Sequence, residues 1–533
     1  MKTELYRWQS ECLTAWEGSH FRGIVSAVTG AGKTRLALEA IRLLRERKPQ
    51  LRVKIVVPTV PLAQQWQTAL FHAAETEAER PGFFGGEKRD DPSRPVMIYI
   101  LNTARGTLSA HMRREFALGH PCLLICDECH HVQSPHNRRI FDFLTPEVEA
   151  GGLYASLGLS ATPFGTEHDE VLTRNLGEQI FHYDLDSAGS ERVIAPFLLC
   201  EVSVPFLPEE LEDYGSLSAE LRKARIALLQ AHPGLAGLRD QEFLRRVSAL
   251  AHRAEMDPSE PAAVFLLKAY QRKQISNLAQ GRLRCALKLL EAQRREDRVL
   301  VFCERTEQAE LLARMIRRRW GAVCGIYHSG MTKQARERNL REFRDHRVRI
   351  LVSCRCLDEG IDVPDANVGI VLSGSAAERQ RVQRLGRIVR SAPGKDAARL
   401  YYLYVRDAAE DSAFLPGLSA AGVFQLRYEL TEDAFSHGLY VYAAQSLLSR
   451  ARERGCTEAQ LRELRACLME GLPRGDYLLP PQALEKRRKA AENRHGRNYW
   501  EAMRGIRGIL CGGRSNPYAE VFDPGRTRQG NSA

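Results

Sequence analysis

The chain has 533 residues, of which 44% are hydrophobic, so its length predicts about three folded domains with ordinary buried cores. It contains no apolar stretch of roughly eighteen residues and no secretory signal at its start, so we expect a cytoplasmic protein with reduced cysteines and no membrane span. The formal net charge of +11 favours a polyanionic partner.

Strand and helix signals alternate through the first 200 residues. Residues 22–28 (RGIVSAV) predict a buried strand, and the glycine-rich turn TGAGKT and an amphipathic helical segment follow it. Further strand candidates lie at residues 51–58, 96–101, 122–127 and 154–161. Strands that alternate with helices indicate a parallel sheet covered by helices on both faces.

A second series of the same kind begins near residue 285. Its strand candidates lie at residues 298–303, 349–354, 368–373 and 398–405. We therefore predict an α/β protein with two tandem parallel-sheet lobes, a helical insertion between them and a mainly helical, basic C-terminal domain. The expected boundaries are 1–207 for the first lobe, 208–284 for the insertion, 285–408 for the second lobe and 409–533 for the C-terminal domain.

The turn after the first strand has the pattern of a phosphate-binding loop, although Ala27 stands where that pattern has its first glycine. Backbone N–H groups of such a loop, together with the N-terminus of the next helix, can hold phosphate oxygens. Lys33 would reach the β- and γ-phosphates, and Thr34 would offer its hydroxyl to Mg²⁺. The pattern predicts ATP and Mg²⁺ as cofactors. The expected nucleotide contacts in the loop are Thr29, Gly30, Ala31, Gly32, Lys33 and Thr34.

The stretch LLICDECHHVQ, which contains the end of the fourth strand candidate, permits two interpretations. Cys126, Cys129 and His130 match the C-x-x-C-H pattern of covalent haem attachment and, with the next histidine, could ligate zinc. Asp127 and Glu128, in contrast, follow a buried strand, where an ATPase holds Mg²⁺ and activates water. Haem attachment requires export, and zinc would compete with magnesium chemistry. The phosphate loop therefore favours Asp127 as a metal ligand and Glu128 as the residue that activates water.

Further motifs occur in a fixed order around these two, and the set resembles that of superfamily 2 helicases of the DExH type. YRWQSECLTAW is similar to the glutamine motif, which implies that Gln9 recognises adenine. DECH is similar to the acid motif, and SATP (160–163) to the motif that couples hydrolysis to movement. VVPTVPLAQQW, FFGGEKR and LNTAR resemble segments that contact a nucleic-acid strand. The contacts implied in these segments are Thr59, Gly85, Gly86 and Thr103.

The second lobe carries the later motifs VLVFCERTEQAE, GIYHSGM, LVSCRCLDEGIDVP and QRLGRIVR. The resemblance implies that both lobes are RecA-like and that Gln383, Arg387 and Arg390 are catalytic. The two arginines lie three positions apart on a helical stretch, so both can act on the γ-phosphate as arginine fingers, an effect worth roughly 10³–10⁵ in rate. The implied nucleotide contacts are Gly360 and Asp362, and the implied strand contact is Ser353.

The spelling of the last motifs resembles XPB-like and restriction-translocase-like DNA helicases. Val389 stands where DEAD-box proteins usually have glycine, and DEGIDVP is not their usual form. Cys354, in a position where the family often has threonine, departs from the pattern and bears on one strand contact. The resemblance implies ATP-dependent movement on DNA, favoured over RNA, with 3′-to-5′ polarity.

Two functions remain open at this point. The chain is either such a motor or a nucleotide-gated recruitment ATPase that signals to a nuclease or other protein effector on its C-terminal domain, in defence or repair. A phosphate-loop kinase is disfavoured, because it would not need the second-lobe motifs. The insertion is expected to bridge the lobes with some DNA contact. Eleven basic and five acidic residues follow position 483, so the tail, with Tyr499 and Trp500, either binds nucleic acid or packs against a protein surface.

Overall fold

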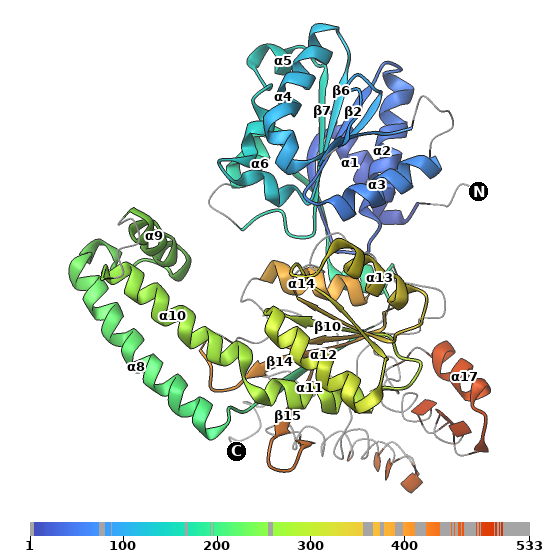
Figure 1. The fold of residues 1–533 in the computed structure, drawn as a ribbon. Helices are drawn as coiled ribbons and strands as arrows, with labels where there is room; N and C mark the ends of the chain where they lie inside the picture. Colours follow the sequence, from blue (N-terminus) through green and yellow to red (C-terminus); the bar gives the residue numbers. More distant parts are fainter. Residues whose placement is uncertain are drawn as a thin grey trace, which may run out of the picture. The chain divides into compact units, whose positions relative to one another are not determined.

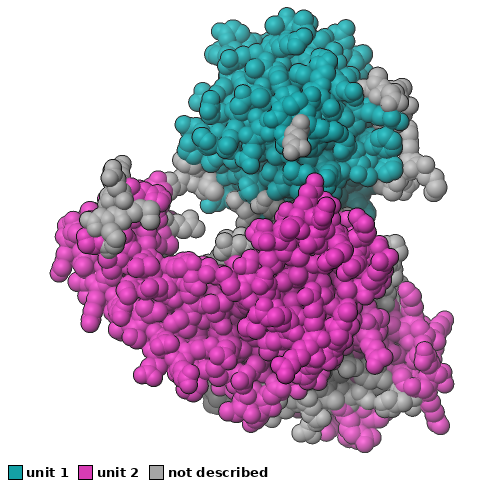
Figure 2. Space-filling model, viewed as in Figure 1, with its two compact units in different colours: residues 1–197, 356–367, 377–398 teal, residues 198–355, 368–376, 399–533 magenta. Residues whose placement is uncertain are grey.

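The computed structural model describes most of the first 354 residues and a smaller part of the rest. The described ranges are 5–73, 80–86, 88–165, 169–191, 193–195, 197–253, 259–354, 366–373, 378–389, 398–409, 411, 423–436 and 481–490, with scattered residues between 449 and 504. Contacts divide the chain into two compact units, which Figure 2 shows in different colours. Unit 1 comprises residues 1–197, 356–367 and 377–398, and unit 2 comprises the remainder.

Unit 1 is built on an eight-stranded sheet with the order β4-β3-β5-β2-β6-β7-β1-β8. Figure 1 labels its neighbouring strands β2, β6 and β7. Neighbouring strands are parallel except for β3 and β4, which form an antiparallel pair. The inner strands are buried along almost their whole length, as expected for apolar strands covered on both faces. The strands are β1 (Arg22–Ala27), β2 (Arg52–Val57), β3 (Gly82–Gly85), β4 (Lys88–Arg89), β5 (Val96–Ile100), β6 (Cys122–Asp127), β7 (Tyr154–Ser160) and β8 (Gln179–Tyr183).

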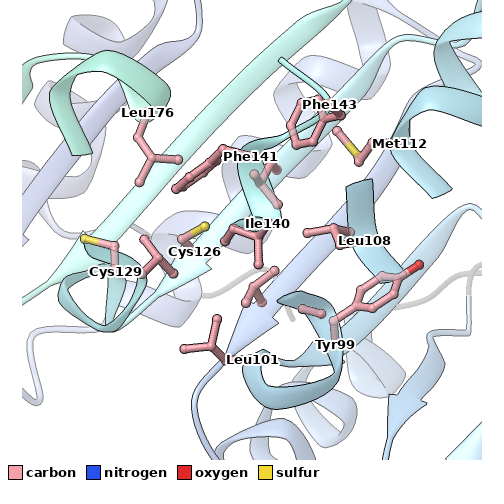
Figure 3. Close-up of a cluster of buried hydrophobic side chains, with 14 of the residues drawn as sticks. Tyr99, Leu101, Leu108, Met112, Cys126, Cys129, Ile140, Phe141, Phe143 and Leu176 are labelled. Carbon is pink, nitrogen blue, oxygen red and sulfur yellow. The ribbon is translucent and has the colours of Figure 1, made fainter. Parts of the chain in front are cut away.

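Helices connect successive strands of this sheet, as parallel pairing requires. They are α1 (Arg7–Gly18), α2 (Lys33–Arg47), α3 (Val60–Ala73), α4 (Leu101–Ala117), α5 (Pro146–Ala150), α6 (Asp169–Leu176) and α7 (Leu185–Ser190), with the short 3₁₀ helices η2 (Cys129–Gln133) and η3 (Asn137–Phe141). Figure 3 shows a buried cluster in which Leu108 and Met112 of α4 lie near Ile140 and Phe143. This cluster fixes α4 and the segment after β6 against the sheet.

Unit 2 contains a second eight-stranded sheet with the order β11-β12-β10-β13-β14-β9-β15-β16. The strands from β11 to β14 are parallel, β9 and β15 are parallel, and β15 and β16 are antiparallel. The two tandem parallel-sheet lobes are thus confirmed. The strands are β9 (Phe197–Val204), β10 (Val299–Cys303), β11 (Cys324–Tyr327), β12 (Ile350–Cys354), β13 (Val368–Val371), β14 (Ala398–Val405), β15 (Val423–Glu429) and β16 (Ala434–Ser436).

The helical insertion forms a small subassembly of unit 2 with its own apolar core. Phe243 and Phe265 meet edge to face in that core, with ring centroids 5.6 Å apart. The helices concerned are α8 (Pro208–Ala231), α9 (Asp240–Arg253) and α10 (Pro261–Leu278), with the 3₁₀ helix η4 (Pro233–Leu235). The other helices assigned to unit 2 are α11 (Gln280–Ala292), α12 (Thr306–Trp320), α13 (Lys333–Arg344) and α17 (Pro481–Ala490).

Three placements differ from the expected division of the chain. Strand β9 precedes the expected boundary at residue 207 but pairs within the second sheet. Strands β15 and β16 lie in the C-terminal region that was expected to be mainly helical, and they extend the same sheet. Helix α14 (Glu378–Ile388) was expected in the second lobe, but its contacts group it with unit 1, where the Ala195 N–H donates to the Val389 carbonyl at 2.8 Å.

Candidate nucleotide and nucleic-acid site

The predicted nucleotide residues come together because of the strand order in unit 1. Strands β6, β7 and β1 are neighbours, and all three are parallel. Asp127 ends β6, Ser160 ends β7, and the phosphate loop follows β1. The carboxyl ends of parallel strands meet at one edge of a sheet, where such folds usually bind ligands. The loop and the acid pair, far apart in sequence, therefore share one edge.

The phosphate loop has the backbone geometry that anion binding needs. Gly30 and Gly32 have φ angles of 92° and 94°, a region that residues with a Cβ rarely adopt. Helix α2 begins directly after Gly32, so its first N–H groups and its dipole face the loop. The Lys33 ammonium donates to the carbonyls of Ala27 and Val28 at 2.9 and 3.4 Å. A bound phosphate can take over these donors.

Gln9 lies against the phosphate loop rather than at the surface, with 1% of it exposed. Its Nε2 donates to the Gly32 carbonyl at 3.0 Å, and its Oε1 accepts from the Tyr6 N–H at 2.9 Å. A Cβ on Gly32 would lie 2.9 Å from the same Nε2, and the φ of 94° at Gly32 is what favours glycine there. Gln9 is thus positioned next to the nucleotide loop.

Asp127 is a buried carboxylate held by two donors. Its Oδ2 accepts from the Trp66 indole N–H at 2.8 Å, and its Oδ1 accepts from the Glu128 N–H at 3.0 Å. Burial raises the pKa of Asp127, while the hydrogen bond from Trp66 and the nearby Lys33 ammonium act in the opposite direction. The Asp127 carboxylate and the Thr34 hydroxyl are hard oxygen donors, which suit Mg²⁺. Thr34 and Asp127 therefore fit the predicted metal.

Glu128 and the SATP segment both lie close to His130. Glu128 has a φ angle of 49°, so the chain turns sharply directly after β6. His130 Nδ1 lies 3.0 Å from the Ser160 hydroxyl and 3.5 Å from a carboxylate oxygen of Glu128. The Ser160 hydroxyl also accepts from the Thr162 N–H at 3.1 Å. The motif predicted to couple hydrolysis to movement thus touches the acid motif through one histidine.

The two cysteines around the acid pair are part of the core. Cys126 and Cys129 are fully buried in the cluster of Figure 3, beside Phe141 and Leu176. Burial raises the pKa of both thiols well above the usual range, which opposes the thiolate form that zinc needs. In the described part of the chain, no three or more histidine, cysteine, aspartate and glutamate side chains form a group that could hold a metal ion. No helix there is long and apolar enough to cross a bilayer.

The predicted strand contacts of the first lobe lie along the other half of the same sheet edge. Thr59 follows β2, Gly85 ends β3, and Thr103 lies in the first turn of α4, just after β5. Strands β3, β5 and β2 are consecutive in the sheet, and β2 is next to β6. Gly86 has a φ angle of 58°, which glycine permits. These residues form one row that continues the row of nucleotide residues.

Ser353, the predicted strand contact of the second lobe, is placed differently. It lies in β12, is 1% exposed, and its hydroxyl donates to the Val301 carbonyl at 3.3 Å. A direct contact with a phosphate would require that hydrogen bond to break.

The arginine motif is described only in part. Gln383 and Arg387 of α14 are 4% and 5% exposed. Gly386 lies so close to the phosphate loop that a Cβ added there would come within 2.2 Å of the Thr29 Cβ. Helix α14 therefore reaches the loop. The remaining predicted residues, Gly360, Asp362 and Arg390, lie outside the described residues.

The residue that the sequence analysis missed is Trp66. It is fully buried, and its partner Asp127 lies 61 positions further along the chain. The motif VVPTVPLAQQW contains Trp66, but its only assigned residue was Thr59. The helical spacing of that segment indicates a core position and gives no hint of a hydrogen-bonded carboxylate.

Two family models match the chain, one in each lobe. Residues 2–165 match "Type III restriction enzyme, res subunit", and residues 281–392 match "Helicase conserved C-terminal domain". The first match includes the phosphate loop and the acid pair, and the second includes the arginine motif.

Known proteins with helicase names are similar to the chain. The DNA 3′-5′ translocase XPB2 of Sulfurisphaera tokodaii is 28% identical over 393 residues, which are 73% of this chain and 79% of that protein. The DNA 3′-5′ helicase XPB of Kineococcus radiotolerans is 25% identical over 410 residues, which are 76% of this chain and 60% of that protein. The match to a Rad25 relative from Haloarcula marismortui spans 50% of that relative.

A solved structure shares the fold. S. cerevisiae Dbp5 bound to RNA and ADP BeF3 has a TM-score of 0.51 and 13% identity, with 80% of this chain and 90% of that chain covered. At this identity the likeness concerns the fold alone. The fold, the ordered motifs and the two family models agree, and together with these relatives they make the chain a superfamily 2 helicase similar to the XPB-like DNA helicases.

Proposed function

We propose that this helicase uses ATP hydrolysis to move 3′-to-5′ along DNA. The observation that carries the proposal is the single sheet edge of unit 1, on which the nucleotide residues after β1, β7 and β6 continue into the predicted strand contacts after β2, β5 and β3. An ATPase that does not act on nucleic acid has no need of the second row. The named activities of the XPB relatives support DNA and the polarity.

The proposed chemistry assigns each group one task. The amides at the start of α2 and the Lys33 ammonium bind the phosphates, and Gln9 contacts the adenine. Mg²⁺ held by Thr34 and Asp127 would neutralise phosphate charge. Glu128 orients water for in-line attack and takes its proton.

The arginine motif supplies the remaining positive charge. Arg387 follows Gly386, which lies against Thr29 of the phosphate loop, so its helix is near the nucleotide. We propose that Arg387 and Arg390 stabilise charge on the γ-phosphate, that Gln383 helps to orient the attacking water, and that Gly360 and Asp362 contact the nucleotide. Cycles of binding and hydrolysis would then move Thr59, Gly85, Gly86 and Thr103, and second-lobe groups around Ser353, along one strand.

The test is steady-state ATP hydrolysis by the purified chain, without nucleic acid and with single-stranded DNA, duplex DNA, tailed duplex or RNA. We expect strong stimulation by DNA, weaker stimulation by RNA, and no activity without Mg²⁺. A Lys33→Ala variant is the control for contaminating ATPases. Basal hydrolysis that no nucleic acid stimulates would contradict the motor.

We also propose a cytoplasmic location. The alternative proposal is a recruitment ATPase with a protein effector on the C-terminal domain. Strand displacement by the chain alone discriminates between the motor and a recruitment ATPase, because a recruitment ATPase can hydrolyse ATP without separating strands. We expect displacement of a duplex with a 3′ tail and none of a duplex with a 5′ tail.

A further inference from the structure

The hydrogen bond between Trp66 and Asp127 joins two functional parts of unit 1. The Trp66 side chain is fully buried, and its indole Nε1 lies 2.8 Å from the Asp127 Oδ2. A hydrogen bond to a carboxylate is stronger than one between neutral groups, and it fixes the orientation of the acceptor. Since the Glu128 N–H occupies Oδ1 at 3.0 Å, both oxygens of Asp127 are held in place.

The helix that carries Trp66 begins at a predicted strand contact. Helix α3 starts at Val60, and the Ala63 N–H donates to the Thr59 carbonyl at 3.1 Å, so Thr59 is attached to the first turn. Trp66 lies about two turns further along. The Thr59 hydroxyl is buried and has no hydrogen-bond partner among the described atoms. One rigid helix therefore carries an unsatisfied polar group at its start and a donor to the metal-site carboxylate in its middle.

The sheet explains why α3 can make this link. The helix follows β2 and packs against β2 and β5. Strand β2 is the boundary between the two rows of functional residues, because its neighbours are β5 on one side and β6 on the other. A helix over this boundary is near the ends of both β2 and β6.

We propose that Trp66 is a positioning residue that holds Asp127 in the orientation for Mg²⁺ and transmits nucleic-acid binding at Thr59 to the metal site. The proposal rests on the proposed function and adds a residue to it. Hydrogen bonds to metal-binding side chains commonly change metal affinity by roughly 10–100-fold, which sets the expected size of the effect. Displacement of α3 when a strand binds Thr59 would change the direction of the same hydrogen bond.

The first experiment measures binding of a fluorescent ADP analogue by the full chain during a Mg²⁺ titration, which requires no turnover. Trp66→Phe removes the N–H donor and keeps an aromatic ring. We expect the Mg²⁺ concentration at half-maximal enhancement of nucleotide binding to rise about 10-fold. Nucleotide affinity in EDTA should stay within about twofold, because the phosphate loop is intact.

A matched control exists in the same unit. Trp16 is 1% exposed, and its indole donates to the Ser156 carbonyl at 2.9 Å. Trp16→Phe thus removes a comparable hydrogen bond that involves no predicted site residue. Equal Mg²⁺ midpoints in Trp16→Phe and Trp66→Phe would overturn the inference. If wild type itself shows no Mg²⁺-dependent nucleotide binding, the proposed function fails instead.

The second experiment tests transmission. The Mg²⁺ titration is repeated with saturating single-stranded DNA. We expect DNA to shift the wild-type and Trp16→Phe midpoints and to leave the Trp66→Phe midpoint unchanged. An equal shift in all three proteins would overturn the transmission step. If Trp66→Phe lowers the thermal midpoint, 3-benzothienylalanine at position 66 repeats both experiments, since it keeps the shape of tryptophan and lacks the N–H.

Discussion

At the scale of single residues, the proposed phosphate binding would exchange one set of Lys33 partners for another. The Lys33 ammonium donates to the backbone carbonyls of Ala27 and Val28, which lie where β1 ends and the phosphate loop begins. These bonds satisfy a partly buried charge, and in the proposed complex phosphate oxygens would replace the carbonyls. His130 and Ser160 hold the segment around Glu128 in a comparable way.

The role of Glu128 gives the first prediction. Glu128→Gln keeps the shape of the side chain but removes the carboxylate that accepts the proton. We expect nucleotide binding to remain within about threefold and turnover to fall by about 10²–10⁴. Fluorescent ADP binding and phosphate release in the same preparation measure both. Normal turnover in this variant would remove Glu128 from its proposed role.

The sequence predicts Lys33, Thr34, Asp127 and Glu128 because their chemistry depends on a short local backbone path. Trp66 could not be predicted, because its partner lies on another strand and only the fold brings the two together. Ser353 shows the opposite case, since the motif predicts a strand contact and the structure buries its hydroxyl within the sheet. A motif thus predicts which residues belong to a candidate site, but it does not predict the environment of their side chains.

At the scale of elements, apolar runs predict strands, but they do not predict the sheet to which a strand belongs. All nine predicted strands are present, and each strand begins and ends within two residues of its predicted bounds. Strand β9 was missed, and it pairs with β15, more than 200 positions later in the chain. Strands β3, β4, β11 and β16 are so short that two to four residues carry little periodicity. Strands that pair across more than 200 positions of the chain, as β9 and β15 do, leave no signal of that pairing in the local sequence.

Arg282 joins several elements of unit 2 and gives the second prediction. It is fully buried in α11 and donates to the Leu372 and Leu403 carbonyls at 2.7 and 2.8 Å, and it pairs with Asp411. Arg282→Met leaves these acceptors buried without their donor, so we expect a loss of about 3–5 kcal/mol in the free energy of unfolding. Urea unfolding measures it.

The neighbouring Arg284 provides the control for that experiment. Its side chain is exposed, so Arg284→Met should change the free energy of unfolding by less than about 0.5 kcal/mol. Similar losses in both variants would mean that the Arg282 network does not hold unit 2 together.

At the scale of the whole molecule, buried thiols in both units predict how stability depends on pH. Burial raises the pKa of Cys12, Cys122 and Cys324 from 9.0 to about 12. Above pH 9 the unfolded chain loses these thiol protons and the folded chain keeps them, so the unfolded state binds fewer protons. Their contribution to stability is complete below pH 9 and decreases as pH rises, by about 1.4 kcal/mol per pH unit for each thiol.

Urea unfolding at pH 8, 9 and 10 under reducing conditions tests this third prediction. We expect the free energy of unfolding to fall between pH 9 and pH 10, and to fall less steeply in a variant with alanine at these three positions. The same slope in wild type and variant would assign the loss to other groups.

The last prediction concerns the C-terminal tail, whose residues suit both nucleic-acid binding and packing against a protein surface. Trp500 lies 4.7 Å from the Arg294 guanidinium and 5.4 Å from that of Arg487, measured to the ring centroid, so Trp500 packs against Arg294, which follows α11 in the same unit. Arg488 and Arg504 both pair with Glu485, whose pKa these charges lower to about 2. Glu485 therefore neutralises part of the positive charge of the tail, and Trp500 anchors the tail.

Charge and packing can be separated, because Lys489, Arg494 and Arg497 are exposed. Replacing these three residues by glutamine removes charge and leaves Trp500 in place, whereas Trp500→Ala removes the anchor and leaves the charge. If the tail contacts duplex phosphates, each lost contact should reduce the slope of log affinity against log salt concentration by about 0.9, while Trp500→Ala should lower the thermal midpoint. DNA affinities between 50 and 300 mM salt decide the matter. A slope that the glutamine variant leaves unchanged would assign the tail to packing or to a protein partner, since counterion release follows only from phosphate contacts.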